Sequence, residues 1–333
     1  MRFQLFFCFL SVSLFGAHKD LSYSRSTIHF LPEIVIESPT HCERLVFLHI
    51  PKTAGTNLDN IFKVFSCIRG DFDYQRLPVP RIQGRSPILI TSDWMGGLKQ
   101  LEDKPHLLSQ IPNKILLTGH FPYEEILESC KYITLIRSPL ERELSSANFD
   151  LQRGYIEEEQ IESYLLERML DNPQTRMIAG KQFMQGPCSE QTFIAAKANI
   201  EKNFFLAAPS EDVDLFIQII AANQGWGPVA YAPMQITKEK ISLNSDLTAA
   251  LKEKHKWDTE LYAWVKDRWE SWKDKQVFTF KTPLSTIPTL LPDFLSTREV
   301  VFLTMDQIHI YNMRSDGALC EGIQIFKNIS LKQ

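Results

Sequence analysis

The stretch RLVFLHIPKTAGTNLDNIF, residues 44–62, decides the predicted fold. Residues 44–50 are a compact apolar run, and the short turn PKTAGT follows them directly. Beyond the turn, Leu58, Ile61 and Phe62 recur at helical spacing. This order predicts a buried strand, a tight loop and a helix, which together make one βα unit.

Two further apolar runs, 115–118 and 132–136, are typical of buried strands, and each ends in a polar turn. His120 stands in the first of these turns and Arg137 in the second. Strands that alternate with helices predict an α/β fold with a mainly parallel sheet. Because ligands collect beyond the carboxyl ends of such strands, we expect all three turns to meet at one edge of the sheet.

The rest of the chain divides into segments of different pattern. Helical spacing predicts helices over 140–149, 155–170, 190–203, 213–222 and 246–273, and apolar runs predict short strands at 88–91 and 204–207. In the last helix an aromatic stripe that includes Trp257, Trp264, Trp269 and Trp272 predicts core packing, with a sugar-stacking surface as the alternative. The predicted organisation is a signal or short membrane segment (1–17), a linker (18–43), a catalytic domain (44–280) and a small β-rich C-terminal extension (281–333).

Composition excludes several classes of protein. The chain has 333 residues, of which 44% are hydrophobic and 23% charged, so it is neither disordered nor a disulfide-stapled scaffold. The net charge of −4 gives no indication of nucleic-acid binding. The six cysteines are scattered without metal-ligand spacing, so no metal site is expected.

The first residues, MRFQLFFCFLSVSLFG, resemble the apolar core of a signal peptide. The run is short for a membrane span, which needs about 20 apolar residues. The bulky Phe15 stands two residues before Ala17, where a cleavage site favours a small residue. Export, membrane association through the N-terminus and a cytoplasmic location therefore all stay open.

The turn HIPKTAGTN has the features of a phosphate cradle. A helix that opens directly after a strand presents backbone N–H groups and the positive end of its dipole. Lys52 supplies a charge, Gly55 allows close approach of the backbone, and Thr53 and Thr56 offer hydroxyls. The GxxxxGK[ST] spacing of nucleoside triphosphatases is absent, which disfavours a P-loop kinase. A simple capped helix is the structural alternative.

The second element is YITLIRSPLERELSSANF, residues 132–149. Arg137 lies just past a strand, and Ser145 lies eight residues further on in the helix that Pro139 opens. Two such donors could grip one phosphate group. A capped surface helix with an arginine salt bridge is the alternative.

Together these two elements resemble the cofactor-binding signatures of the carbohydrate sulfotransferases, the family that includes the heparan sulfate 2-O- and 6-O-sulfotransferases. HIPKTAGT is similar to the family's HIPKTGGT loop, and RSPLERELS is similar to its R-x-P-x-x-R-x-x-S segment. Weaker similarities follow in the expected order, at LLTGHFPY (116–123), DNPQTRMIAG (171–180), AKANIEKNFFLAA (196–208) and LYAW (261–264).

The resemblance implies a P-loop-like, three-layer fold that binds 3′-phosphoadenosine 5′-phosphosulfate (PAPS). The reaction would move its sulfuryl group to a hydroxyl on a glycan or another acceptor, without a metal. By the same resemblance Arg137 and Ser145 would hold the 3′-phosphate. The 5′-phosphosulfate would lie against the loop formed by Lys52, Thr53, Ala54, Gly55, Thr56 and Asn57.

A general base that titrates near neutral pH is needed to deprotonate the acceptor, which favours histidine. His120 follows a predicted buried strand at the same end of the sheet as the two phosphate elements. We therefore predict His120 as the base, with Lys52 stabilising the leaving phosphate oxygen. Glu124 and Glu125 are the alternative bases, and His49 is expected to be packed within the first strand.

Two arginines complete the predicted site. Arg142 is expected to be a charge on the helix surface or facing the substrate, and Arg176 either contacts cofactor or acceptor or forms a buried pair with Asp171. One residue departs from the family pattern: Ala54 adds a methyl group where the family has glycine. A nucleotide- or glycan-binding protein that has the fold but lacks catalysis is therefore the alternative function.

Overall fold

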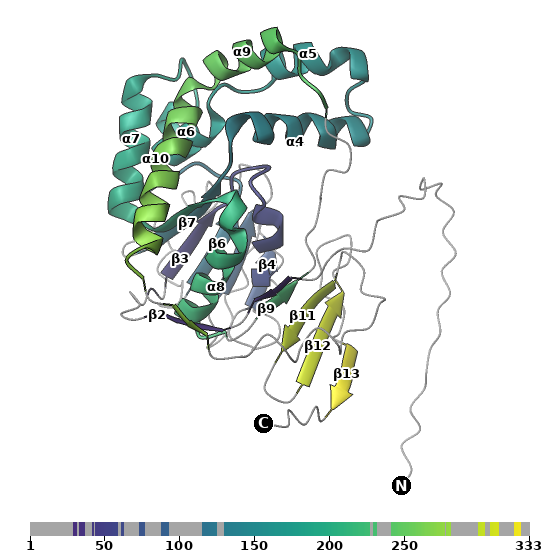
Figure 1. Cartoon of the computed structure of the whole chain (residues 1–333), viewed down its shortest axis with the longest axis vertical. Helices are drawn as coiled ribbons and strands as arrows, with labels where there is room; N and C mark the ends of the chain where they lie inside the picture. The colour runs from purple at the N-terminus through teal and green to yellow at the C-terminus, as the bar shows by residue number, and fades with distance from the viewer. Residues whose placement is uncertain are drawn as a thin grey trace, which may run out of the picture.

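The computed structural model describes residues 29–31, 33–36, 42, 44–58, 61–62, 73–76, 88–92, 115–124, 130–226, 229–231, 241–276, 278–280, 299–303, 307–312 and 323–327. Among these, six strands form the central sheet, and every neighbouring pair in it is parallel. Their spatial order is β4 (Asp73–Arg76), β5 (Ile88–Ser92), β6 (Ile115–Gly119), β3 (Arg44–Leu48), β7 (Lys131–Ile136) and β8 (Phe204–Pro209). The prediction of an α/β fold with a mainly parallel sheet is confirmed (Figure 1).

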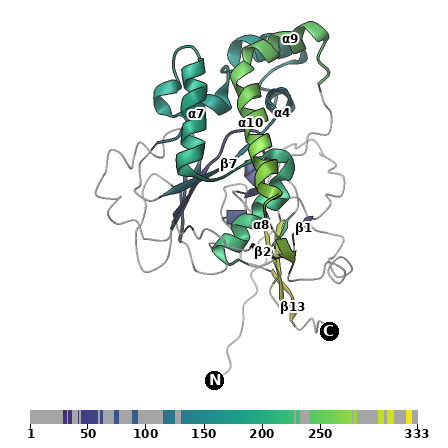
Figure 2. The same cartoon turned by 60° about the vertical axis from the view of Figure 1, so that its left-hand side comes forward.

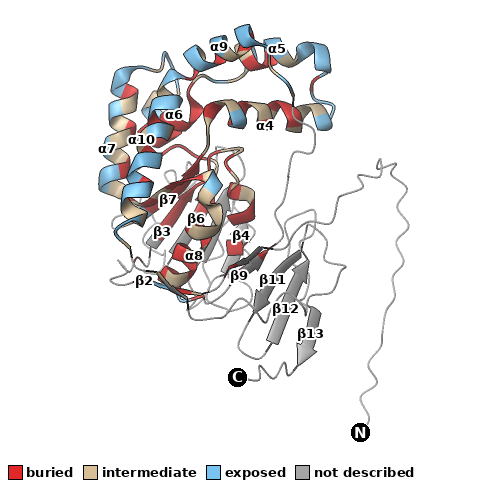
Figure 3. Ribbon diagram, viewed as in Figure 1, coloured by how far each residue is buried: buried red, intermediate tan, exposed pale blue. Residues whose placement is uncertain are grey.

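Strand β3 lies inside this sheet and is buried on both faces, which explains its continuous apolar run. Leu45 and Phe47 pack on one face with residues of α8 (Val213–Gln224). Val46 and Leu48 pack on the other face with residues of α6 (Pro173–Ala179), α7 (Glu190–Asn203) and α10 (Lys256–Lys273). Figure 2 shows α7 and α10 side by side, and Figure 3 shows the buried residues on the sides of the helices that face the sheet.

The predicted long helix 246–273 is two helices, α9 (Ser245–Lys254) and α10, which separate at His255. His255 is fully buried with φ −107° and ψ 32°, outside the helical region, and its Nδ1 accepts the N–H of Asn172 at 3.2 Å. The prediction of one continuous helix is therefore wrong, because a tertiary contact holds this residue out of the helix. Core packing is confirmed for Leu261, Val265 and Trp269.

Residues 155–170 form no regular helix, in contrast to the prediction. A 3₁₀ turn (Glu158–Gln160), the short α5 (Ile161–Ser163) and a π-helical turn (Tyr164–Arg168) follow one another there. Tyr164 and Leu165 are buried with Leu247 and Leu251 of α9, so packing against α9 decides this local geometry. Helix α4 (Pro139–Gln152) agrees with the predicted helix over 140–149.

A second sheet, of five strands in the described part of the chain, joins distant segments. The predicted C-terminal strands are β11 (Glu299–Leu303), β12 (Gln307–Asn312) and β13 (Ile323–Lys327). They continue antiparallel into β9 (Val229–Tyr231) and β1 (His29–Leu31). Strand β1 falls in the stretch for which a linker is predicted, as does β2 (Ile34–Ile36), which pairs with β10 (Phe278–Phe280).

The predicted segment 1–17 lies outside the described residues. Within the residues that are described, the structure has no helix with the length and apolar character of a membrane span.

Candidate active site

The three predicted turns meet at one edge of the central sheet. They follow β6, β3 and β7, which are adjacent and parallel, so their carboxyl ends lie side by side. The His49 N–H donates to the carbonyl of Gly119 at 2.9 Å, and Arg137 donates from Nη1 to the carbonyl of Lys52 at 3.3 Å. These two hydrogen bonds join the middle turn to both of its neighbours, as the sequence analysis expects.

The turn after β3 has an unusual backbone. Lys52 and Ala54 adopt left-handed conformations with φ of 70° and 67°, and Thr53 between them does not. Alternation of this kind turns successive N–H groups toward a common concavity, which is an arrangement that binds anions. The Thr53 side chain is fully buried, and its hydroxyl donates to the carbonyl of Ile50 at 2.9 Å. Thr53 therefore stabilises the turn with its side chain, and its main chain is the part suited to a ligand.

Gly55 begins the helix that follows this turn, where residues 55–58 and 61–62 are helical. A β-carbon at this position would lie 2.3 Å from Cδ2 of His49. The His49 ring is buried and stacks on Phe47, with ring centroids 5.2 Å apart. His49 is therefore packed, as predicted, and the glycine is required by this ring. Thr56 is half-buried and Asn57 is buried in the same first turn of the helix.

Lys52 lies near three arginines and one aspartate. Its Nζ is 4.0 Å from the centroid of the Phe149 ring on α4. Burial lowers the pKa of Lys52 from 10.5 to about 8; Asp150 opposes this shift, and the positive charges of Arg137, Arg153 and Arg142 add to it.

Arg153 and Phe149 are absent from the predicted site. The Arg153 guanidinium lies 4.5 Å from the centroid of the Phe149 ring that also contacts Lys52. Phe149 and Arg153 stand four residues apart at the end of α4, so helical spacing places them on one face. That spacing is the signal in the sequence that could have identified the pair.

The main chain of Arg137 is held by Gln174, a residue to which the sequence analysis gives no role. The Arg137 N–H donates to Oε1 of Gln174 at 2.9 Å, and Nε2 of Gln174 donates to the Arg137 carbonyl at 2.8 Å. The Arg137 side chain is partly exposed, and its Nε donates to Glu141 at 3.4 Å. Gln174 is buried, so this pair of bonds fixes the start of α4 from within the molecule.

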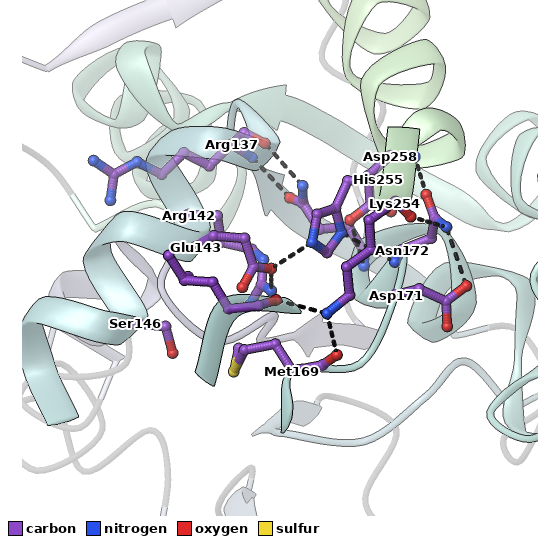
Figure 4. A network of polar contacts seen from close by, with 12 residues as sticks. Arg137, Arg142, Glu143, Ser146, Met169, Asp171, Asn172, Lys254, His255 and Asp258 are labelled. Carbon is purple, nitrogen blue, oxygen red and sulfur yellow. Dashed lines mark hydrogen bonds and ion pairs between the residues drawn. The ribbon is translucent and has the colours of Figure 1, made fainter. Parts of the chain in front are cut away.

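Asn172, His255 and Asp258 belong to a buried polar network behind the site (Figure 4), and Asp258 in turn fixes Gln174. Asp258 of α10 accepts the N–H of Gln174 at 3.2 Å, and it accepts both the N–H and the hydroxyl of Thr175 at 2.7 Å. The Asp258 N–H donates to Oδ1 of Asn172 at 3.0 Å. Burial raises the pKa of the Asp258 carboxyl, and the bonds from Thr175 oppose this shift. Asp258 thus caps the first turn of α6.

Arg142 is buried, so the first of its two predicted alternatives, a charge on the helix surface, is wrong, and the second, a charge that faces the substrate, stays a prediction. Its guanidinium pairs with the adjacent Glu143, which is also buried and lies 3.5 Å from Nε2 of His255. Burial raises the pKa of Glu143, and burial with the charge of Arg142 lowers the pKa of His255 to about 3. This face of α4 packs against the junction of α9 and α10, which removes Arg142 from solvent. Ser145 is buried on the same helix.

Arg176 corresponds to the second of its two predicted alternatives, a buried pair with Asp171. It donates from Nη2 to Oδ1 of Asp171 at 2.6 Å and from Nε to the Asp171 carbonyl at 2.8 Å. The carbonyls of Phe183 and Gly186 accept at 2.7 and 2.8 Å. With 1% of its surface exposed, Arg176 joins α6 to the segment that follows it.

His120 lies at the end of β6 and is half-buried. Its Nδ1 is 2.6 Å from the carbonyl oxygen of His49. Because a carbonyl only accepts, Nδ1 carries the hydrogen, and the lone pair of the neutral ring is on Nε2. Of the alternative bases, Glu124 is 3.5 Å from Nζ of Lys181, and Glu125 lies outside the described residues.

Across the described ranges, no group of three or more histidine, cysteine, aspartate or glutamate side chains could hold a metal ion.

A scan against protein-family models found none that matches this chain, and a search of curated proteins returned no significant match.

Proposed function

We propose that this protein is a sulfotransferase that moves a sulfuryl group from PAPS to a hydroxyl group of a glycan. The observation that carries the proposal is the meeting of Lys52, Arg137 and His120 at the carboxyl ends of three adjacent parallel strands. The resemblance of both phosphate elements to the carbohydrate sulfotransferases supports the same reaction.

The donor would be held at two places. Residues 52–57 would bind the 5′-phosphosulfate through Lys52 and through the N–H groups of the left-handed turn. Arg137 and Ser145 would bind the 3′-phosphate. Lys52, Arg137 and Arg153 would supply positive charge for a ligand with several phosphate charges, although the net charge of the chain is −4.

The reaction would be an in-line displacement at sulfur. Nε2 of His120 would take the proton of the acceptor hydroxyl, and the acceptor oxygen would form a bond to sulfur. The bond between sulfur and the 5′-phosphate oxygen would break, and Lys52 would stabilise the negative charge that develops on that oxygen. The products are a sulfate ester and 3′,5′-ADP.

One observation favours the second candidate, a binding protein with the same fold and no catalysis. Ala54 adopts φ 67°, a conformation that favours glycine, within the loop that would align the phosphosulfate. A small displacement of bound donor there would reduce transfer more than binding.

The first test is calorimetric titration with 3′,5′-ADP. We expect Lys52→Ala and Arg137→Ala each to weaken binding by about 10- to 100-fold, because each removes a charge-assisted hydrogen bond. The exposed residues Lys252 and Arg168 supply the matched controls Lys252→Ala and Arg168→Ala, which should change nothing. Unchanged affinity in both site variants would show that the cofactor assignment is wrong.

The second test is transfer from labelled PAPS to a panel of glycans. His120→Ala should lower turnover by about two to four orders of magnitude and leave the affinity for 3′,5′-ADP unchanged. Donor binding without transfer by the unmodified chain would favour the binding protein over the enzyme.

A further inference from the structure

The side-chain amide of Gln174 holds the main chain of Arg137. The two hydrogen bonds between them, at 2.9 and 2.8 Å, run in opposite directions. The side-chain amide therefore accepts and donates the hydrogen bonds that a neighbouring strand would supply, just after β7 ends at Ile136. Gln174 is 1% exposed, so solvent does not compete for either bond.

The position of Gln174 does not depend on Arg137. Its own N–H donates to Asp258 of α10 at 3.2 Å, and it stands in the first turn of α6. Asn172, immediately before α6, adopts φ 48° and ψ 47° and bonds to both His255 and Asp258. A buried network between α6 and α10 thus aims the Gln174 amide at the end of β7.

The start of α4 lacks an ordinary cap. Ser138 occupies the position before its first residue and makes no side-chain capping bond. The Glu141 salt bridge to Arg137 is exposed, with 54% of the Glu141 side chain accessible, and contributes little. Of these restraints at the β7–α4 junction, the Gln174 amide is the buried one.

We propose that Gln174 is a positioning residue for the 3′-phosphate of the donor, acting through Arg137. The inference rests on the proposed function, in which Arg137 binds that phosphate. When Gln174 is removed, the main chain at Arg137 loses both of these buried hydrogen bonds. Among the described residues, the guanidinium is then held only by its longer bonds to the Lys52 carbonyl and to Glu141, so its position is less fixed. The cost falls mainly on the 3′-phosphate, because the loop of residues 52–57 can lose only the bond from Arg137 Nη1 to the Lys52 carbonyl and keeps its own anchors at Thr53 and His49.

The test compares two ligands that differ in one group, 3′,5′-ADP and 5′-AMP. Gln174→Ala should weaken the binding of 3′,5′-ADP by about tenfold, the cost of fixing the loosened main chain of Arg137 on binding, and should change the affinity for 5′-AMP by less than about twofold. A residue needed only for general stability would lower both affinities equally. Gln174→Glu keeps an acceptor for the Arg137 N–H and loses the donor, so its effect should be intermediate.

Two further variants complete the experiment. Gln191→Ala, at an exposed position of α7, is the matched control and should behave as the unmodified chain. The double variant Arg137→Ala, Gln174→Ala should bind 3′,5′-ADP as weakly as Arg137→Ala alone, because both changes act on the contact between Arg137 and the 3′-phosphate.

Each contrary result has a separate meaning. If the unmodified chain binds 3′,5′-ADP no better than 5′-AMP, the proposed function fails, and the inference fails with it. If the unmodified chain prefers 3′,5′-ADP and Arg137→Ala removes the preference while Gln174→Ala keeps it, the inference alone is overturned. Equal losses of both ligands in Gln174→Ala would also overturn it.

Discussion

Raising the pH should weaken the binding of 3′,5′-ADP through Lys52. Burial lowers the pKa of Lys52 to about 8 in the unliganded protein; Asp150 opposes this shift, and the charges of Arg137, Arg153 and Arg142 add to it. The phosphates need the charged form. At pH 7 roughly nine in ten molecules carry that charge, and at pH 9.5 only about one in thirty do. Affinity should therefore fall about 30-fold between these values, whereas a lysine with an ordinary pKa would stay charged and give almost no change.

The assay is calorimetric titration at pH 7, 8 and 9.5, repeated near pH 8 in two buffers of different ionisation enthalpy to count the protons taken up. Binding should take up close to half a proton at pH 8, since about half of the Lys52 side chains are neutral there. Lys52→Arg keeps its charge throughout this range and should bind with an affinity independent of pH. A constant affinity to pH 9.5 in the unmodified chain, or the same decrease in Lys52→Arg, would show that the charge of Lys52 does not control the binding of 3′,5′-ADP.

Two further predictions concern stability and can be measured by chemical denaturation. Asp258→Ala removes the buried acceptor of three hydrogen bonds, from two N–H groups and one hydroxyl, so it should lower the free energy of unfolding by about 3–5 kcal/mol. Asp246→Ala, at an exposed position, is its control. A loss below about 1 kcal/mol in Asp258→Ala would contradict the network. Ala54→Gly should raise the free energy of unfolding by about 0.5–1 kcal/mol, because relief of the left-handed strain exceeds the added freedom of glycine in the unfolded chain. A destabilised Ala54→Gly variant would mean that the turn does not hold Ala54 at positive φ.

The predicted strand–turn–helix order agrees with the structure because its signals are local. Residues 45–48 are all apolar since β3 is covered on both faces, and such a run is recognisable without knowledge of what covers it. Pro139 and the spacing after it likewise mark α4. The meeting of the turns at one edge follows from the parallel sheet.

The errors arise where a side chain finds a partner far away in the sequence. Helical spacing continues through His255, and only its contact with Asn172 ends the helix there. Arg142 has a charged side chain of a kind that usually lies at the surface, and packing of α4 against the α9–α10 junction buries it. Neither contact leaves a periodic signal in the sequence.

The order of the elements, the turns and the residues proposed to bind phosphate can be read from the sequence, because periodicity and turn chemistry depend on neighbours within about ten residues. How those residues are held depends on contacts between distant segments. Gln174 reaches Arg137 across 37 positions, and Asp258 reaches Thr175 across 83. Bonds over such separations form only when packing of the helices on the sheet brings the two segments together, so they cannot be read from either segment alone.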